Sequence, residues 1–438
     1  MAYLSNSETD FKEMLTAIGV DSFDDLIKNI PEDIRFNGSL DLPEAESEFG
    51  VSRILEKMAA KNENYTSFLG GGVYDHYSPA IIGAIISRSE YYTAYTPYQP
   101  EVSQGNLQLM YEFQSMISEL TQMDVTNASM YEAGSALAEA VLLAVSYSKR
   151  KKVLISAQLN PHYKKVLKTY VENTDIELVD IPEKNGISDM NALAALIDDS
   201  VGTIVMQHPN YLGFFEDMET AAKFREDKKR LLIQVYDPIS LGLIKAPGDF
   251  GADIAVAEGQ SLGIPQNYGG PFVGLFSTTQ QLVRLIPGRL AGITNDVNGK
   301  RGFVLTLQTR EQHIRREKAT SNICTNSGLM ALIAGIYLTT LGKSGIKEVA
   351  ALCLQKSHYL ADELTQLEGV ELVSKAPYFK EFTLKLPVDA DTVINRAAKE
   401  KIFAGLKVDQ DKILMAVTEK RTKEEMDKLV DVFKSVIL

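Results

Sequence analysis

The stretch Gly259-Gln-Ser-Leu-Gly-Ile-Pro-Gln-Asn-Tyr-Gly-Gly-Pro271 is a glycine-rich loop between two apolar runs. Residues 252–257 before the loop and 272–276 after it have the composition of buried strands. A polar loop between two strands is a common place for the chemistry of an α/β enzyme. This loop contains no lysine and no histidine, and its nearest acid is Glu258 at the rim. The loop is therefore either a working site or a site that has lost its central residue.

Strand and helix patterns alternate from residue 153 up to this loop. Strands are expected at 153–155, 176–180, 203–206 and 231–236, and helices at 161–173, 189–199 and 217–228. Such a βαβ series predicts a mostly parallel sheet, and sheets of this kind bind ligands at the carboxyl ends of their strands. His208, Asp237 and Gln260 each follow an expected strand. The sequence therefore predicts that these three side chains converge on one site.

A turn of small residues before Ser135 opens a further apolar helix, where free backbone N–H groups can bind an anion. Together with His208 and Asp237 it would form a cradle for a phosphorylated aromatic cofactor, with the aspartate paired to a pyridinium nitrogen. Such an enzyme needs a lysine at the end of the next strand to form a Schiff base. Gln260 stands in that place, and no lysine lies between Lys245 and Lys300. We therefore expect a vestigial cradle without its covalent anchor.

Residues 91–101 combine tyrosines with Pro97 and Pro100, so a regular helix is excluded there. One interpretation is a surface loop whose tyrosines pack on their own framework. The other is a fixed, extended segment that presents Tyr95, Tyr98 and Glu101 to a site. That site could lie across a subunit interface, where tyrosine is favoured.

Composition places the chain among globular proteins. Its 438 residues, 45% hydrophobic and 24% charged, suffice for two domains or for one large domain with an appendage. The net charge of −13 argues against nucleic acid and anionic membranes as partners. Two cysteines without a CxxC pattern favour a reducing compartment and predict no metal site. With no secretory signal and no apolar run of roughly 18 residues, a cytoplasmic location is expected.

Three regions are expected along the chain. Residues 1–65 predict a helical extension, residues 66–325 a large α/β domain, and residues 326–438 a small α+β domain. Six arginines lie between 284 and 316, and most of them are expected to make structural ion pairs in a chain with 58 acidic residues. Residues 303–318 predict a helix.

Five motifs carry a resemblance to a known family. They are Tyr74-Asp-His-Tyr77, Tyr95-Thr-Pro-Tyr-Gln-Pro-Glu101, Gly259-Gln-Ser-Leu-Gly-Ile-Pro265, Pro287-Gly-Arg-Leu290 and Arg310-Glu-Gln-His-Ile-Arg-Arg-Glu-Lys-Ala-Thr-Ser-Asn-Ile-Cys-Thr-Asn326. Together they resemble the amino-terminal half of glycine decarboxylase, the P-protein of the glycine cleavage system. The match runs along nearly the whole chain. In its length the chain resembles the separate subunit 1. Fused enzymes of the family hold two homologous halves in one longer chain.

The resemblance implies a fold and an activity. The fold is the α/β fold type I of pyridoxal-phosphate enzymes, with a large, mostly parallel sheet domain and a small C-terminal α+β domain. With a homologous subunit 2 in an α2β2 assembly, the family decarboxylates glycine on pyridoxal phosphate. The aminomethyl group then passes to the lipoyl group of H-protein, in glycine catabolism.

The resemblance also places the cofactor. Its lysine belongs to subunit 2, and alignment through Ile264 and Pro265 puts Gln260 at the corresponding position of this chain. Because an amide cannot form an imine, this chain alone is expected to hold no Schiff base and to be inactive.

Three roles are compatible with these observations. In the first, the chain completes the active site in trans, with Tyr95, Tyr98 and Glu101 reaching toward the cofactor on subunit 2. In the second, it is a catalytically silent structural or regulatory partner of subunit 2. In the third, it is an independent pyridoxal-phosphate enzyme that uses another lysine.

Overall fold

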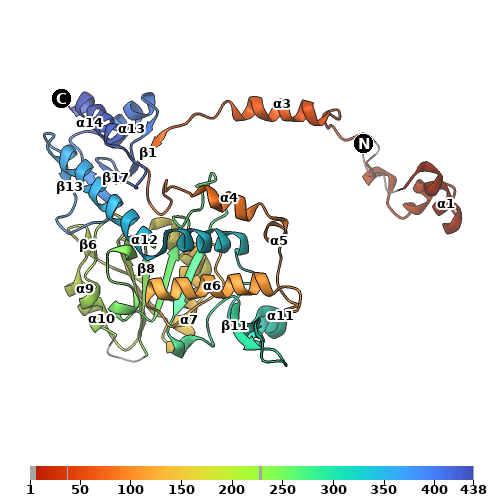
Figure 1. Ribbon diagram of the computed structural model, residues 1–438, viewed down its shortest axis with the longest axis horizontal. Coiled ribbons are helices and arrows are strands. Elements are labelled where there is room, and N and C mark those ends of the chain that lie inside the picture. Colours follow the sequence, from red (N-terminus) through yellow and green to blue (C-terminus); the bar gives the residue numbers. More distant parts are fainter. Residues whose placement is uncertain (1–5, 37, 226–228, 438) are drawn as a thin grey trace. The chain divides into compact units, whose positions relative to one another are not determined.

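The computed structural model describes residues 6–36, 38–225 and 229–437 (Figure 1). The chain divides into two compact units, Met1–Glu63 and Asn64–Leu438, which we call the extension and the body. The predicted boundary between a large and a small domain, at residues 325 and 326, stays a prediction.

The extension consists of short helices and the segments that connect them. Its elements are α1 (Glu8–Ile18), α2 (Phe23–Leu26), η1 (Glu32–Ile34) and α3 (Glu48–Ala59). Ser7, Ser22 and Ser47 cap the three α-helices by accepting a backbone N–H group of the first turn. None of the residues in these helices is buried. Local sequence thus sets where the helices begin, but it provides no core to hold them.

A seven-stranded sheet forms the centre of the body (Figure 1). Its order is β2-β10-β9-β8-β7-β3-β4. Strands β9, β8, β7, β3 and β4 run parallel, and β10 is antiparallel to both of its neighbours. The bounds are β2 (Val125–Thr126), β3 (Lys152–Ser156), β4 (Glu177–Ile181), β7 (Val201–His208), β8 (Leu231–Tyr236), β9 (Ile254–Glu258) and β10 (Gly274–Thr278).

Helices cover both faces of this sheet, which is why every residue of β8 and β9 is buried. In β9, Ile254 and Val256 join the core that contains α7, whereas Ala255 and Ala257 join the core beneath α6 and α12. The helices before α12 are α4 (Ala80–Ile86), α5 (Ser89–Tyr92), α6 (Gln104–Thr121), α7 (Ala133–Ser148), α8 (Pro161–Val171), α9 (Met190–Leu196) and α10 (Met218–Lys223). The end of the predicted helix 217–228 lies outside the described residues.

A second, four-stranded antiparallel sheet has the order β13-β14-β17-β16 and packs with α13 and α14 in a separate core. The bounds are β13 (Glu371–Leu372), β14 (Glu381–Lys385), α13 (Ala390–Lys399), β16 (Leu406–Asp409), β17 (Lys412–Ala416) and α14 (Lys423–Ile437). Smaller elements are β1 (Thr66–Ser67), β5 (Glu183–Lys184), β6 (Ile187–Ser188), η2 (Ser240–Gly242), η3 (Gly248–Phe250), η4 (Gln280–Leu282) and β15 (Ile402–Phe403).

Helix α12 (Gly328–Thr365) joins the two sheets. Gly342 interrupts it with φ 58° and ψ −170°, so the element consists of two helical halves. By length and composition alone α12 could cross a membrane. Its apolar side chains, however, belong to the cores of the body, with Tyr337 in one core and Leu360 in another. It is a core helix of the body.

The predicted helix at 303–318 is wrong. The region instead contains an antiparallel hairpin of strands β11 (Leu290–Asn295) and β12 (Arg301–Thr306). Three short helical segments follow it: η5 (Gln308–Arg310), α11 (Gln312–Arg315) and η6 (Arg316–Lys318). Phe303 and Leu305 are buried against α6, and residues two apart share one face of a strand. An alternation of only two buried residues, Phe303 and Leu305, is too short for the sequence to distinguish a strand from a helix.

Candidate functional site

A small cavity lies at the carboxyl ends of β7, β8 and β9, where the sequence predicted a site. Its volume is about 30 Å³. The lining residues are Gly72, Tyr74, Tyr163, Gln207, Pro209, Val235, Tyr236, Asp237, Pro238, Glu258, Phe379, Lys380 and Glu381. A single water needs roughly 10–15 Å³ of such space, whereas small-molecule pockets run to about 300–1,000 Å³. The cavity is large enough for water but too small for a cofactor.

Lys380 occupies the space beside Asp237. It lies just before β14, its side chain is 2% exposed, and its Nζ is 2.6 Å from Oδ2 of Asp237. The same Nζ is 3.0 Å from Nε2 of His76 and 3.6 Å from the ring centre of Tyr74. The carboxylate that would pair with a pyridinium nitrogen is therefore already paired with an ammonium group of this chain.

Two acidic side chains lie at the start of α7, where a phosphate would have to bind. The Glu132 carboxylate accepts the backbone N–H groups of Gly134 and Ser135, and Glu258 accepts that of Ala133 at 3.2 Å. Burial raises the pKa of Glu258 to about 8, although its backbone hydrogen bonds lower it. The N–H groups predicted at Ser135 are thus already bonded to acidic side chains and are not free to bind a phosphate.

Gln260 is 1% exposed, and both ends of its amide are bonded to backbone. Its Oε1 accepts the N–H of Tyr74 at 2.9 Å, and its Nε2 donates to the carbonyls of Tyr74 at 3.0 Å and Ile264 at 2.7 Å. The side chain therefore joins the glycine-rich loop to the segment around residue 74. Only an amide supplies both the acceptor and the donors that these backbone groups require.

His208 ends β7, but its ring lies away from the cavity, which is lined by its neighbours Gln207 and Pro209. The ring packs near Phe215 and Phe250, and its Nδ1 accepts the backbone N–H of Glu216 at 3.1 Å. Of the predicted cradle residues, only Asp237 lines the cavity. Successive side chains of a strand point to opposite faces, so a strand end alone does not predict which residue points inward.

These contacts show that pyridoxal phosphate does not fit this chain. Gln260, the residue expected at the lysine position, is bonded at both ends of its amide, Asp237 is paired with Lys380, and acidic groups cover the helix start. Sequence reasoning missed Lys380. One signal in the sequence could have indicated its role. Lys380 follows Phe379 and precedes the apolar strand after Glu381, so its side chain is expected to be buried, and a buried charge needs a partner.

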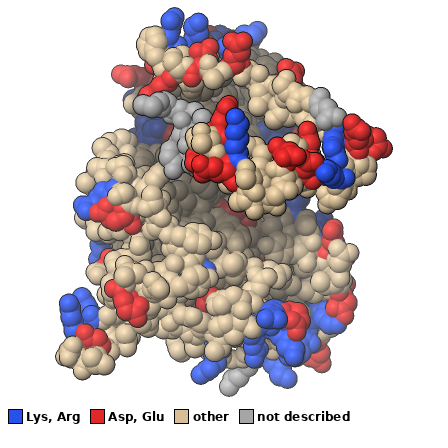
Figure 2. Space-filling model, turned by 90° about the vertical axis from the view of Figure 1, so that its right-hand side faces the viewer, with Lys and Arg blue, Asp and Glu red and all other residues tan. Residues whose placement is uncertain are grey.

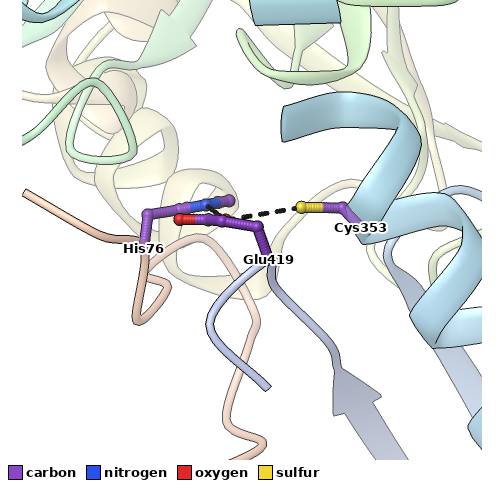
Figure 3. Close-up of side chains that lie close together, drawn as sticks. All are labelled: His76, Cys353 and Glu419. Carbon is purple, nitrogen blue, oxygen red and sulfur yellow. Dashed lines mark hydrogen bonds and ion pairs between the residues drawn. The ribbon is translucent and has the colours of Figure 1, made fainter. Parts of the chain in front are cut away.

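The ion pair continues into a second cluster, formed by His76, Cys353 and Glu419 (Figure 3). Nδ1 of His76 is 2.6 Å from Oε2 of Glu419, and the Cys353 thiol donates to the same oxygen at 3.6 Å. These residue types can bind zinc. Here burial and the Lys380 charge lower the pKa of His76, and burial raises that of Cys353. A neutral thiol and an adjacent ammonium group oppose a metal ion, so the contacts form a hydrogen-bond chain.

The tyrosine segment lies on the surface and does not line this cavity. Tyr95 is 83% exposed and Tyr98 54% exposed, and Glu101 is exposed as well. Tyr95 lines a separate groove of about 160 Å³, which also includes Thr325, Asn326 and the first residues of α12. The structure therefore brings the tyrosines together with the start of α12.

Comparison with known proteins agrees with this architecture. The family described as glycine cleavage system P-protein matches residues 1–433. Probable glycine dehydrogenase (decarboxylating) subunit 1 of Chloroherpeton thalassium is 50% identical over 100% of both chains. The protein of the same name from a Geobacillus species is 48% identical over 98% of this chain and 97% of its own.

Solved structures extend the comparison. The crystal structure of glycine decarboxylase (P-protein) in inhibitor-bound form superposes with a TM-score of 0.92, at 41% identity and 100% coverage of both chains. Glutamate decarboxylase of Lactobacillus brevis is 13% identical over 93% of this chain and 96% of its own, with a TM-score of 0.69. At this identity the likeness concerns the fold alone. The predicted α/β fold type I of pyridoxal-phosphate enzymes is thereby confirmed. The chain belongs to the glycine cleavage system P-protein family, as the resemblance of its motifs had indicated.

Proposed function

We propose that this chain is the subunit of a glycine decarboxylase that completes the active site of a homologous subunit 2. The two subunits would form an α2β2 assembly in the cytoplasm, with the cofactor lysine on subunit 2. The assembly would decarboxylate glycine and pass the aminomethyl group to the lipoyl group of H-protein. One observation carries the proposal: the chain matches subunit 1 relatives over its full length, yet its own cradle is filled by the Lys380–Asp237 pair.

The contribution in trans would come from Tyr95, Tyr98 and Glu101. Their side chains are exposed and lie apart from the filled cavity of this chain. A phenol can bind both an apolar surface and a polar group, which suits it to the wall of a site formed between two chains. These residues would orient the glycine and exclude water at the site of subunit 2.

Exposed apolar surface supports the existence of a partner. In Figure 2, residues other than Lys, Arg, Asp and Glu, polar as well as apolar, make up wide areas of the face shown. A groove of about 510 Å³ runs between α4, α6 and α12, and apolar residues such as Ile81, Leu109 and Ile336 line most of it, with a few polar side chains among them. Soluble monomers rarely leave contiguous apolar surface of this kind uncovered.

Reconstitution tests the proposal. The chain is co-expressed with a candidate subunit 2, and exchange of bicarbonate with the carboxyl group of glycine is measured for each chain alone and for both. Exchange is expected only with both chains. Tyr95→Phe and Tyr98→Phe should each lower turnover by about tenfold or more without dissociating the assembly. Tyr170→Phe on α8 is the control, and unchanged turnover in both tyrosine variants would remove the role in trans.

The two alternatives give different results. A silent partner predicts that subunit 2 is active by itself. An independent enzyme predicts that this chain, incubated with pyridoxal phosphate, forms an adduct that borohydride traps. Lys380 lines the cavity and is paired with Asp237. It is therefore the first lysine to examine for a trapped adduct. We expect no adduct, because acidic side chains already cover the start of α7.

A further inference from the structure

Arg289 connects the tyrosine segment to the start of α12. Its side chain is 2% exposed although it comes from the short turn before β11. Its Nη2 donates to the hydroxyl of Tyr98 at 3.4 Å, and its Nη1 donates to Oγ1 of Thr325 at 2.9 Å and to Oδ1 of Asn326 at 3.5 Å. The guanidinium also lies 5.7 Å from the centre of the Tyr98 ring. Three segments distant in sequence therefore meet on one planar group.

Burying Arg289 in this way costs more free energy than burying an apolar side chain that only fills space. The nearest carboxylate is Oε2 of Glu311, which is 4.0 Å from Nε of Arg289, and Nε itself has no hydrogen-bond partner. A buried guanidinium without a close carboxylate loses hydration that these contacts only partly replace. An apolar side chain of similar length would hold the core at lower cost. What arginine adds is a rigid fork of donors that fixes the orientation of the groups it binds.

We infer that Arg289 is a positioning residue, which sets the Tyr98 hydroxyl and residues 93–103 in the orientation that the partner subunit receives. The bonded groups support this inference, because Thr325 and Asn326 line the same groove as Tyr95. Arg289 itself is too deeply buried to touch the glycine. Its effect on turnover must therefore pass through Tyr98. The inference rests on the proposed role of Tyr98 in trans.

Hydrogen exchange of the full chain alone provides the first test, since it needs neither subunit 2 nor activity. Arg289→Lys keeps the charge but loses the fork, and it should speed amide exchange in residues 93–103 by about threefold or more. Arg284→Lys, an exposed arginine five positions earlier, is the surface control. Arg310→Lys is the buried control, because Arg310 donates to the carbonyl of Ile286. Exchange in residues 93–103 that is unchanged in Arg289→Lys, or equally raised in Arg310→Lys, overturns the inference.

A double-mutant cycle in the assembly with subunit 2 provides the second test. Arg289→Lys should lower kcat by about tenfold with an unchanged KM for glycine, and adding Tyr98→Phe should lower it little further, because both changes remove one interaction. Multiplicative effects of the two substitutions on kcat overturn the inference. Unchanged kcat in Tyr98→Phe alone refutes the role of Tyr98 in trans instead, and the hydrogen-exchange result then decides whether Arg289 positions the segment.

Discussion

At the scale of single residues, the buried Lys380–Asp237 pair is the central feature of the cavity. Lys380→Met should destabilise the body by about 3–5 kcal/mol, because it leaves the Asp237 carboxylate without its partner in a mostly buried position. Urea unfolding measures the loss. Lys385→Met, at the exposed end of the same strand, is the control and should change little.

A second substitution separates the ion pair from simple packing. Asp237→Asn in the Lys380→Met background removes the unpaired charge and keeps an oxygen for the N–H groups of Ile239 and Ser240. The double variant should regain much of the lost stability. A double variant as unstable as Lys380→Met would show that the lysine side chain contributes through packing alone.

His208 makes stability depend on pH. Burial lowers the pKa of its imidazole from the ordinary 6.5 to about 4. Between these values the unfolded chain binds a proton that the folded chain does not, so stability falls as the pH falls from 6.5 toward 4. The loss from this group is roughly 3 kcal/mol at most.

The variant His208→Gln keeps an acceptor for Glu216 and does not titrate, so its stability should decline less over this pH range. Chemical unfolding at several pH values measures the difference from the unmodified chain. His162→Gln, an exposed histidine on α8, should leave the pH dependence unaltered. Parallel stability curves for the unmodified chain and His208→Gln would refute the assignment.

At the scale of elements, the kink of α12 depends on Gly342. Its φ of 58° and ψ of −170° fall in a region that is open essentially to glycine alone, although a Cβ would meet nothing within 4 Å. Gly342→Ala should therefore destabilise the body by about 1–3 kcal/mol through backbone strain.

The matched control is Gly83→Ala in α4, where a Cβ also meets nothing within 4 Å and the backbone is helical. That change should be neutral or stabilise by about 0.5–1 kcal/mol, because alanine is the better helix former. Thermal unfolding compares the two variants. Equal effects of the two substitutions would show that the kink is not held by the glycine backbone.

At the scale of the whole molecule, the extension has no buried residue among residues 6–36 and 38–63, which are those described in it. Its 14 acidic and 6 basic side chains supply −8 of the net charge of −13, and most of its described large apolar side chains are exposed, among them Phe11, Phe49 and Leu55. An acidic amphipathic segment is unsuited to anionic membranes, which bind helices rich in lysine and arginine. We therefore expect the extension to bind a protein surface, such as that of subunit 2.

Removal of residues 1–63 should leave the body folded, since all the buried residues of its hydrophobic cores lie beyond residue 63. The unfolding free energy of the body should change by no more than about 0.5 kcal/mol, as for surface changes. Association with subunit 2, measured by analytical ultracentrifugation, should weaken. Unchanged association would show that the extension has another role.

The sequence by itself determined the strands of the main sheet other than β2, the family and the absence of a lysine at residue 260. These follow from local information: β-branched runs, cap residues and long motifs need no distant neighbour to be interpreted. The position of Asp237 at the end of a parallel strand was predictable for the same reason, because the βαβ order places successive strand ends on one edge of the sheet.

Only the tertiary structure decided what fills the site. Lys380 reaches Asp237 from the second sheet, and Glu132 and Glu258 meet at the start of α7 from different elements. The hairpin at 290–306 likewise depends on its packing against α6. Contacts between residues far apart in the chain produce no periodic pattern in the sequence. Burial stabilises side chains that are close in space, whatever their separation along the chain. The place of Asp237 was thus predictable, but the lysine that pairs with it was not.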